Sequence, residues 1–156
     1  MDTEFEAKIL DIDVDTILSK LKSLGAKKIK EREQKRYVYD FFPKKDNSWV
    51  RLRTDGEETT LTIKEIQNDN IDGTEEIELE VSDFEKANFL LEKLGYSNNG
   101  YQENKRISYV LEGVQVEIDF WPLIPPYLEV EGNSEEEVEK IVKLLGYEIS
   151  QTTSMN

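Results

Sequence analysis

Apolar and polar residues alternate with a period of two along most of this chain, a pattern that predicts β-strands. The alternating segments are residues 4–10, 28–42, 48–53, 59–66, 75–81, 101–111, 114–120 and 127–131. Asp55-Gly56 and Glu112-Gly113 separate neighbouring segments, and such pairs are typical of tight hairpin turns. The polar segment 67–73 and the proline-rich segment 121–126 are expected to be loops.

Three other segments change to a helical period, with apolar side chains three or four residues apart. They cover residues 14–24, residues 84–94 and a stretch that ends before residue 146. The candidate N-caps are Asp13 or Asp15, Ser82 or Asp83, and Asn133 or Ser134. The glycines expected to end the helices are Gly25, Gly95 and Gly146. We expect the apolar stripes of these helices to pack against the sheet.

The order of these elements repeats along the chain, which indicates internal pseudo-symmetry. A Glu-x-Glu pair, a capped helix and a Leu-Gly pair occur three times, beginning at Glu4, Glu78 and Glu129. The first two helices are followed by matching strand sequences, EQKRYVY at 33–39 and ENKRISY at 103–109. Two similar β-α-β halves with a partial third copy predict a sheet that closes on itself.

One face of nearly every predicted strand is charged. The sets that share a face are Glu4/Glu6/Lys8, Arg51/Arg53, Thr60/Thr62/Lys64, Glu76/Glu78/Glu80, Glu117/Asp119 and Glu129/Glu131. For a single strand, a solvated outer face explains such a pattern. Across the chain, however, the signs are segregated by strand, and crowded carboxylates repel one another unless a cation bridges them. We therefore hypothesise a charged bore in which a divalent cation meets the carboxylates and the basic residues bind phosphate.

Composition narrows the chemistry of this bore. The chain has 156 residues, which favours one domain spanning residues 1–156, and the absence of a composition break supports it. The formal net charge of −14 disfavours binding to nucleic acid or to an anionic membrane. Because the sequence has no Cys and no His, a metal must be held by oxygen ligands, which favours Mg²⁺, Mn²⁺ or Ca²⁺. No signal peptide or membrane-spanning run is evident, so we expect a cytoplasmic protein.

The ordered motifs resemble those of the CYTH superfamily, the triphosphate tunnel metalloenzymes. The matching segments are Glu4-x-Glu6-x-Lys8, Val50-Arg51-x-Arg53, Thr62-x-Lys64, Glu76-x-Glu78, Lys105-Arg106, Asp119 and Glu129-x-Glu131. The stretch DFWPLIPPYLEVEG at 119–132 resembles the class IV adenylyl cyclase-like branch. The resemblance covers nearly the whole chain. It implies an α+β fold, namely a single-domain closed antiparallel β-barrel of about eight strands that forms a tunnel, with helices packed outside.

The resemblance also implies a role for each matched residue. The metal, Mg²⁺ or Mn²⁺, would be held by Glu4, Glu6, Asp119, Glu129 and Glu131. The triphosphate would be bound by Lys8, Arg51, Arg53, Lys64 and Arg106. Glu76 and Glu78 resemble a secondary acidic set, and Lys8 and Glu78 are the candidate catalytic residues.

The sequence departs from this pattern at two places. Asn104 stands where the family's basic strand often has Lys, which removes one expected phosphate contact. The chain ends at Asn156, earlier than many relatives, so a lid or plug is expected to be missing or supplied otherwise. By alternation Lys105 should face away from the bore. We place Lys35 and Arg36 at the surface or the rim.

The leading functional hypothesis is metal-dependent hydrolysis of inorganic triphosphate or of a small organic triphosphate. One alternative is an adenylyl cyclase that converts ATP to cAMP and pyrophosphate. Two others are a non-catalytic domain that binds polyphosphate or nucleotide, and a purely structural acidic barrel. The expected partner is the small-molecule triphosphate, bound by a monomer or a homodimer. We interpret Trp121 and its proline-rich loop as a structural corner, with contact between a substrate base and Trp121 or Tyr127 as the alternative.

Overall fold

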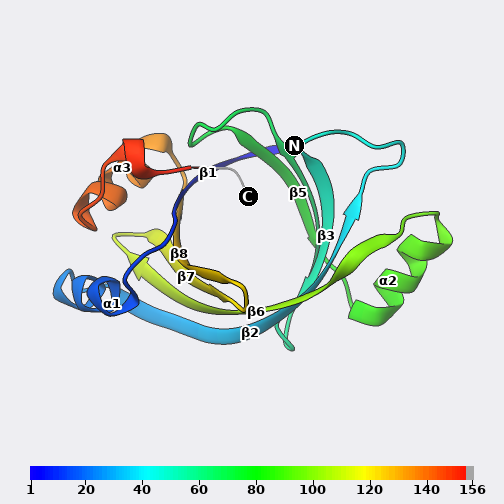
Figure 1. Ribbon diagram of the computed structural model, residues 1–156, viewed down its shortest axis with the longest axis horizontal. Helices are drawn as coiled ribbons and strands as arrows, with labels where there is room; N and C mark the ends of the chain where they lie inside the picture. The colour runs from blue at the N-terminus through cyan, green and yellow to red at the C-terminus, as the bar shows by residue number, and fades with distance from the viewer. Residues whose placement is uncertain (154–156) are drawn as a thin grey trace.

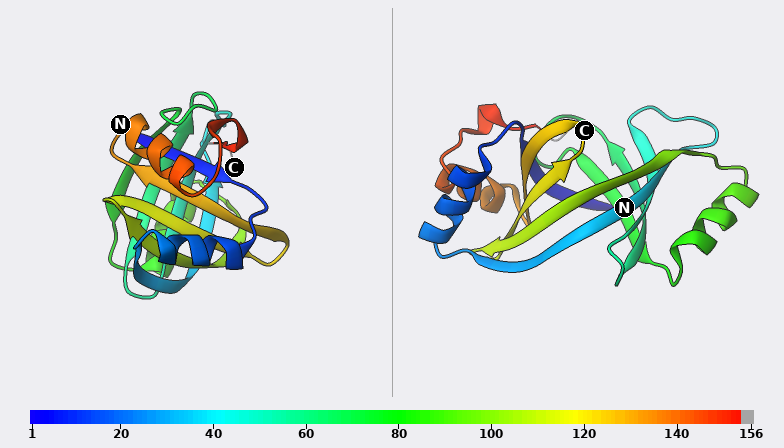
Figure 2. Two further views of the ribbon diagram at one scale, coloured as in Figure 1. Left: turned by 90° about the vertical axis from the view of Figure 1, so that its left-hand side faces the viewer. Right: turned by 60° about the horizontal axis from the view of Figure 1, so that its bottom comes forward.

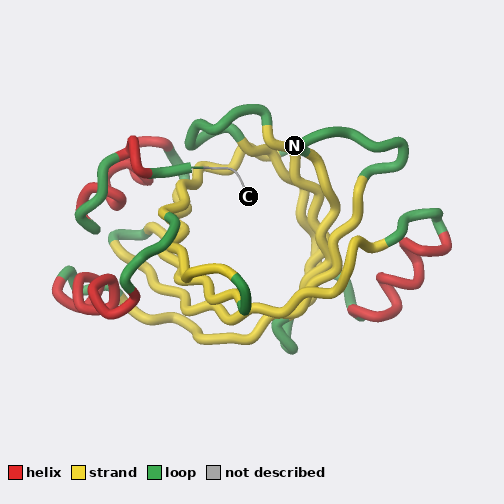
Figure 3. Tube along the Cα trace, in the orientation of Figure 1, coloured by secondary structure: helices red, strands yellow, loops and turns green. Residues whose placement is uncertain are grey.

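The alternating strands form a barrel in a computed structural model that describes residues 1–153. Within this range the sheet closes in the order β1-β5-β4-β3-β2-β6-β7-β8, and every pairing is antiparallel (Figures 1 and 3). The strands are β1 (Asp2–Ile9), β2 (Lys27–Asp40), β3 (Ser48–Thr54), β4 (Thr59–Ile66), β5 (Thr74–Glu80), β6 (Asn98–Leu111), β7 (Val114–Trp121) and β8 (Ile124–Gly132). The helices are α1 (Val14–Ser23), α2 (Phe84–Lys93), α3 (Glu135–Leu144) and the short 3₁₀ helix η1 (Ile149–Gln151). The predicted fold class is confirmed.

The seam of the barrel lies at β1. Residues 2–4 of β1 pair with β5, and residues 5–9 pair with β8. Just before β5 begins, the carbonyl of Ile71 accepts a hydrogen bond from the backbone N–H of Glu6 over 3.0 Å. The backbones of Lys8 and Thr153 exchange hydrogen bonds of 2.7 and 2.9 Å. These contacts satisfy the edge of β1, so the strand that carries Glu4, Glu6 and Lys8 is held along its length.

The helices begin and end at predicted residues. The side chains that cap the N-termini, each by accepting from an N–H three residues later, are Asp13, Asp83 and Ser134. Gly25, Gly95 and Gly146 follow the helices with φ of 77°, 101° and 93°. This left-handed conformation carries little penalty for glycine, and it turns the chain back toward the sheet. Among residues 1–153, none of the helices has the length and hydropathy of a membrane-spanning segment.

Two separate apolar cores cover the outer face of the barrel. The larger core joins α1 and α3 to the outer side of β1, β7 and β8, and includes Ile17, Val116 and Ile141 (Figures 1 and 2). In the smaller core α2 packs on β3, and Leu91 and Leu52 belong to the same buried cluster. Full burial of each such side chain contributes about 1.5–3 kcal/mol. Because the apolar side of each strand faces these cores, the charged side faces the inside of the barrel.

The proline-rich segment differs from its prediction as a loop. Strand β7 runs through Trp121 and strand β8 begins at Ile124, so the turn covers only residues 122–123. Pro125 and Pro126 lie at the start of β8, where a strand tolerates residues without an N–H. The carbonyl of Pro126 accepts instead from the backbone N–H of Ile12 over 3.2 Å. The structure thus corrects the loop at 121–126 to a tight hairpin.

Candidate active site

The inside of the barrel is a charged tunnel with a cavity of about 270 Å³. Among residues 1–153, the cations that line it are Lys8, Arg32, Arg36, Arg51, Arg53, Lys64 and Arg106. The carboxylates that line it are Glu4, Glu76, Glu78, Glu117, Glu129 and Glu131. The predicted phosphate-binding residues therefore all face the tunnel, as do most of the predicted metal ligands. The hypothesis of a solvated outer face does not describe these strands.

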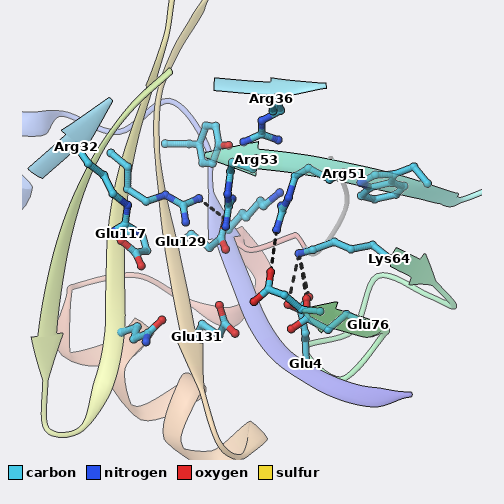
Figure 4. A pocket seen from close by; sticks show the side chains of 16 residues that line it. Glu4, Arg32, Arg36, Arg51, Arg53, Lys64, Glu76, Glu117, Glu129 and Glu131 are labelled. Atoms are coloured by element: carbon cyan, nitrogen blue, oxygen red, sulfur yellow. Dashed lines mark hydrogen bonds and ion pairs between the residues drawn. The ribbon is translucent and has the colours of Figure 1, made fainter. Parts of the chain in front are cut away.

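The two signs occupy different parts of the tunnel wall (Figure 4). Glu4, Glu6, Glu76 and Glu131 come from β1, β5 and β8, and we call this set the carboxylate side. Arg36, Arg51 and Arg53 come from β2 and β3, and we call this set the guanidinium side. Lys64 pairs with Glu4 of the carboxylate side, and Arg106 lies near Glu129. The segregation by strand in the sequence becomes a segregation in space because the barrel holds each strand at a fixed position.

The carboxylate side contains a group suited to a metal ion. Glu4, Glu6 and Glu131 each offer a carboxylate oxygen, and these oxygens lie within 4.8 Å of one another. Glu4 and Glu6 are buried, with 7% and 3% of their surfaces exposed. A set of carboxylate oxygens fits a hard divalent cation such as Mg²⁺ or Mn²⁺. The residues present therefore fit the metal that the resemblance implies.

Protons relieve the repulsion on the carboxylate side when no cation is bound. Burial, reinforced by the charge of Glu129, raises the pKa of Glu6 to about 8. Burial and a hydrogen bond with Glu4 raise the pKa of Glu76 to about 9. Burial and the charge of Glu129 also raise the pKa of Glu131 to about 7. At neutral pH, protons thus occupy part of the space that a cation would take.

Glu129 behaves in the opposite way. Burial opposes its ionisation, but the charges of Lys8, Arg106 and Lys64 outweigh burial and lower its pKa. The Nη2 atom of Arg106 lies 4.0 Å from a Glu129 oxygen. Because Glu6 also hydrogen-bonds with Glu129, the two carboxyl groups titrate as a coupled pair, in which the pKa of Glu6 is raised and that of Glu129 is lowered. Glu129 therefore connects the carboxylate side to the cations of the tunnel.

Several of the predicted phosphate-binding cations already have acidic partners. Lys64 Nζ lies 3.1 Å from Glu4 Oε2. Arg51 Nη2 lies 3.7 Å from Glu78 Oε1. Glu78 in turn accepts a 2.7 Å hydrogen bond from the hydroxyl of Thr62. These contacts hold the long side chains in the tunnel and limit the rotamer entropy lost when a ligand binds.

Asp119 lies apart from the three carboxylates of Glu4, Glu6 and Glu131. It is fully buried and accepts two hydrogen bonds from Arg106, of 2.8 and 3.0 Å. Asn104 donates to Asp119 and to Gln34, each over 3.2 Å. The position that departs from the family pattern therefore belongs to a buried network that holds Arg106.

The arginines of β2 are the part of the site that sequence analysis missed. The placement of Arg36 at the surface or rim is wrong, because Arg36 lines the tunnel beside Arg53, its register partner. Arg32 also lines the tunnel, and it lies 3.7 Å from Asp55. Because side chains alternate strictly between the two faces of β2, Arg32 and Arg36 share a face, and this pattern could have predicted both in the tunnel. Lys35 is exposed as expected, and Lys105 faces outward, 2.7 Å from Glu31.

Lys8 and Trp121 lie near Tyr127. The Nζ atom of Lys8 lies 5.6 Å from the centre of the Tyr127 ring. The indole N–H of Trp121 donates to the Tyr127 hydroxyl over 3.0 Å. This bond is consistent with the structural role expected for Trp121.

Solved structures with the same architecture support this description. The PH1012 protein of Pyrococcus horikoshii is 26% identical, with a TM-score of 0.82 over 96% of this chain and 93% of that one. A Vibrio parahaemolyticus protein described as a candidate adenylate cyclase is 14% identical, with a TM-score of 0.82 over 99% and 95%. A Hippeastrum protein described as a candidate adenylyl cyclase with a dominant triphosphatase activity is 19% identical, with a TM-score of 0.63 over 92% and 88%. The search of curated proteins found no match.

A family model gives the same result over almost the full length of the chain. The model of the CYTH domain matches residues 2–153, which include every strand and helix of the barrel. The match agrees with the ordered charged motifs and with the closed tunnel that they line. The chain belongs to the CYTH domain family and has its triphosphate tunnel fold.

Proposed function

We propose that this protein is a metal-dependent triphosphatase that hydrolyses a triphosphate inside the tunnel. The observation that carries the proposal is the placement of three metal-competent carboxylates, within 4.8 Å of one another, in the same barrel as the guanidinium side. A triphosphate chain is a linear polyanion, so it matches a narrow cavity with cations along its length. The triphosphatase activity described for the Hippeastrum protein supports the choice of hydrolysis.

The cations of the tunnel would bind the non-bridging oxygens of the phosphate chain. Arg51, Arg53 and Arg106 offer planar forks of N–H donors that match two phosphate oxygens at once, whereas Lys64 offers a single charge. Donors held in place before the reaction stabilise the charge that develops on the transferred phosphoryl group. Lys8, at the end of the tunnel near Tyr127, would orient the chain or assist the leaving group.

The metal, Mg²⁺ or Mn²⁺, would be held by Glu4, Glu6 and Glu131, with Glu129 beside them. When bound, it would neutralise phosphate charge and polarise the phosphorus–oxygen bonds. Asp119, also predicted as a ligand, lies on Arg106 instead. We propose that Asp119 acts by holding that guanidinium group against the phosphate chain.

Glu78 would act as the general base. It faces the tunnel and is positioned by Thr62 and Arg51. Glu78 would take a proton from water while the water oxygen forms a bond to the terminal phosphorus. The bond from that phosphorus to the bridging oxygen would break, releasing phosphate and a diphosphate.

The test measures phosphate release from inorganic triphosphate, thiamine triphosphate and ATP with Mg²⁺ or Mn²⁺. We expect metal-dependent release by the wild-type protein and none by a Glu4→Ala/Glu6→Ala double variant. Glu33→Ala, on the outer face of β2, is the matched control. Undiminished release by the double variant would contradict the proposal. Chromatography of the products from ATP separates hydrolysis from cAMP formation, and calorimetric binding without turnover would indicate a non-catalytic domain.

A further inference from the structure

The two apolar cores outside the barrel are covered unequally. Helices α1 and α3 both pack over the larger core, whereas α2 alone packs over the smaller core, on the opposite side of the barrel (Figure 1). Beyond α2, the outer face of the sheet stays apolar: Leu61 on β4 pairs with Leu79 on β5, and Ile63 pairs with Ile77. Ile77 and Leu79 are 46% and 51% exposed, so no helix within residues 1–153 covers the outer face of β5.

The side of α2 that faces β4 and β5 is also apolar. Glu85 accepts a 3.3 Å hydrogen bond from a tyrosine hydroxyl of β2, and Glu92 accepts one of 3.4 Å from the side-chain amide of Asn98 on β6. This side of the helix therefore faces β2 and β6. Leu90 and Leu94 project from the opposite side, because they lie about 140–180° around the helix from both glutamates. In the strand order of the barrel, that side faces β4 and β5.

These side chains form one apolar surface beside the helix. Leu90 and Leu94 are 59% and 64% exposed, and the half-buried Leu61 and Ile63 lie between them and β5. Contiguous exposed apolar surface is typical of protein–protein interaction sites. We call this surface the open apolar face, and its exposed members are Ile77, Leu79, Leu90 and Leu94.

Opposite charges border the two parts of the open apolar face. On the sheet, Glu65 and Glu75 are register partners, and like charges placed opposite each other repel. A lysine 3.1 Å away offsets Glu65, but Glu75 forms no ion pair within residues 1–153. On the helix, the exposed Lys86 and Lys93 lie one turn to either side of Leu90, and neither forms an ion pair within the same residues. The sheet part therefore has a surplus of negative charge, and the helix part has a surplus of positive charge.

We propose that the open apolar face is the interface of a homodimer, in which α2 of each copy packs on β5 of the other. A second copy fits because one chain carries both complementary parts, an apolar helix side bordered by cations and an apolar strand face bordered by carboxylates. In a two-fold interface each contact occurs twice. Leu90 and Leu94 of each copy would thus cover Ile77 and Leu79 of the other.

The same arrangement would bring Lys93 of each copy to Glu75 of the other. It would also give the smaller core a second helix, as the larger core has. The proposal goes beyond the proposed function and does not depend on it, because none of these residues lines the tunnel.

Sedimentation equilibrium at rising protein concentration tests the proposal. The measurement uses 0.15 M salt, because a Debye length of about 8 Å screens the repulsion between two chains of net charge −14. We expect the wild-type protein to show a monomer–dimer equilibrium. Leu79→Gln and Leu90→Gln should each weaken dimerisation by about tenfold or more, because each removes buried apolar surface twice. Ile29→Gln, at an apolar position of β2 that is 54% exposed, is the matched control.

A charge exchange tests which surfaces meet. Lys93→Glu and Glu75→Lys should each weaken dimerisation by at least about threefold, since each replaces two attractive contacts by repulsive ones. The double variant should recover the wild-type affinity. Because all these positions lie at the surface, melting curves of the dilute variants should match the wild type. A wild-type protein that stays monomeric, or a Leu79→Gln variant that associates as Ile29→Gln does, would overturn the inference. A double variant without recovery would reject the packing of α2 on β5.

Discussion

The carboxylate side and the guanidinium side of the tunnel relieve the repulsion among their like charges in different ways. Glu6 and Glu76 keep protons at neutral pH, because burial raises the pKa of each to about 8 or above. Guanidinium groups cannot lose their protons at this pH. Arg51 therefore pairs with Glu78, whereas Arg36 and Arg53 form no ion pair within the described residues.

The difference shows what each side requires from a ligand. A cation that enters the carboxylate side must displace protons, so its binding depends on pH. An anion that enters the guanidinium side displaces no protons. It provides a partner for Arg36 and Arg53 and so offsets the free-energy cost of burying an unpaired charge. A metal–triphosphate complex satisfies both sides at once.

Asp119→Asn should break the contact that holds Arg106 in the tunnel. The substitution keeps the shape of Asp119 but removes the closest negative charge from the buried guanidinium group of Arg106, which then has only Glu129 at 4.0 Å. Loss of one member of a buried pair typically lowers the free energy of unfolding by about 3–5 kcal/mol. Urea denaturation measures the change, with Glu33→Gln as an exposed control. If Asp119 were a metal ligand, the variant would instead lose the metal-dependent rise in melting temperature while its metal-free stability stayed unchanged.

Arg53→Gln should remove one unpaired charge from the guanidinium side. Because Arg53 is available for an anion, the variant should lose catalytic efficiency by about 100- to 1,000-fold, as when one preorganised donor is removed. Steady-state phosphate release with saturating Mg²⁺ measures this loss. Lys105→Gln, on the outer face of β6, should retain wild-type rates. A loss of less than about threefold would argue against phosphate binding by Arg53.

Glu131→Gln should weaken the carboxylate side without changing its shape. Removing one of three charged oxygen ligands should reduce Mn²⁺ affinity by at least about tenfold, since even outer-shell partners of metal ligands contribute that much. Calorimetric titration with Mn²⁺ measures the affinity, and Glu80→Gln on β5 is an exposed control. Unchanged affinity would place the metal elsewhere in the tunnel.

The metal-free protein should become less stable as the pH rises. Glu6 and Glu76 have raised pKa values, so the folded state binds more protons than the unfolded state between about pH 4.5 and 9. Their contribution is complete below pH 4.5 and is lost as the pH rises to about 9. We expect the melting temperature in EDTA to fall between pH 6 and 9 by at least about 2–4 °C, the shift that about 1 kcal/mol produces in a domain of this size. Mg²⁺ should raise it most at pH 9.

Glu76→Gln, which resembles the protonated side chain, should make this decline shallower, whereas the exposed Glu80→Gln should leave its slope unchanged. Comparing the two variants separates the effect of the buried carboxylates on stability from the general repulsion caused by the net charge of −14. If the melting temperature in EDTA instead rose with pH, the inference that Glu6 and Glu76 hold protons in the folded state would be wrong.

Local pattern was sufficient to predict most of the fold. The period of two identified the strands, and the caps at Asp13 and Asp83 are residues that the sequence itself proposed. The failures occurred where local rules conflict. Prolines suggested a loop at 121–126, but a strand can begin with them when another segment supplies its hydrogen bonds. Arg36 faces the tunnel as Arg106 does, in agreement with strict alternation along β2, so the error lay in placing Lys35 and Arg36 together at the surface or rim.

The sequence by itself determined which side chains share a face of each strand, because that depends only on the two-residue repeat of the backbone. It therefore identified the charged inner surface and the family. Tertiary structure alone decided the distances: the pairing of β1 with β8 brings Glu6 opposite Glu131, and the pairing of β2 with β3 brings Arg36 opposite Arg53. These contacts join residues far apart in the chain, and their register depends on barrel closure and on the packing of the helices outside.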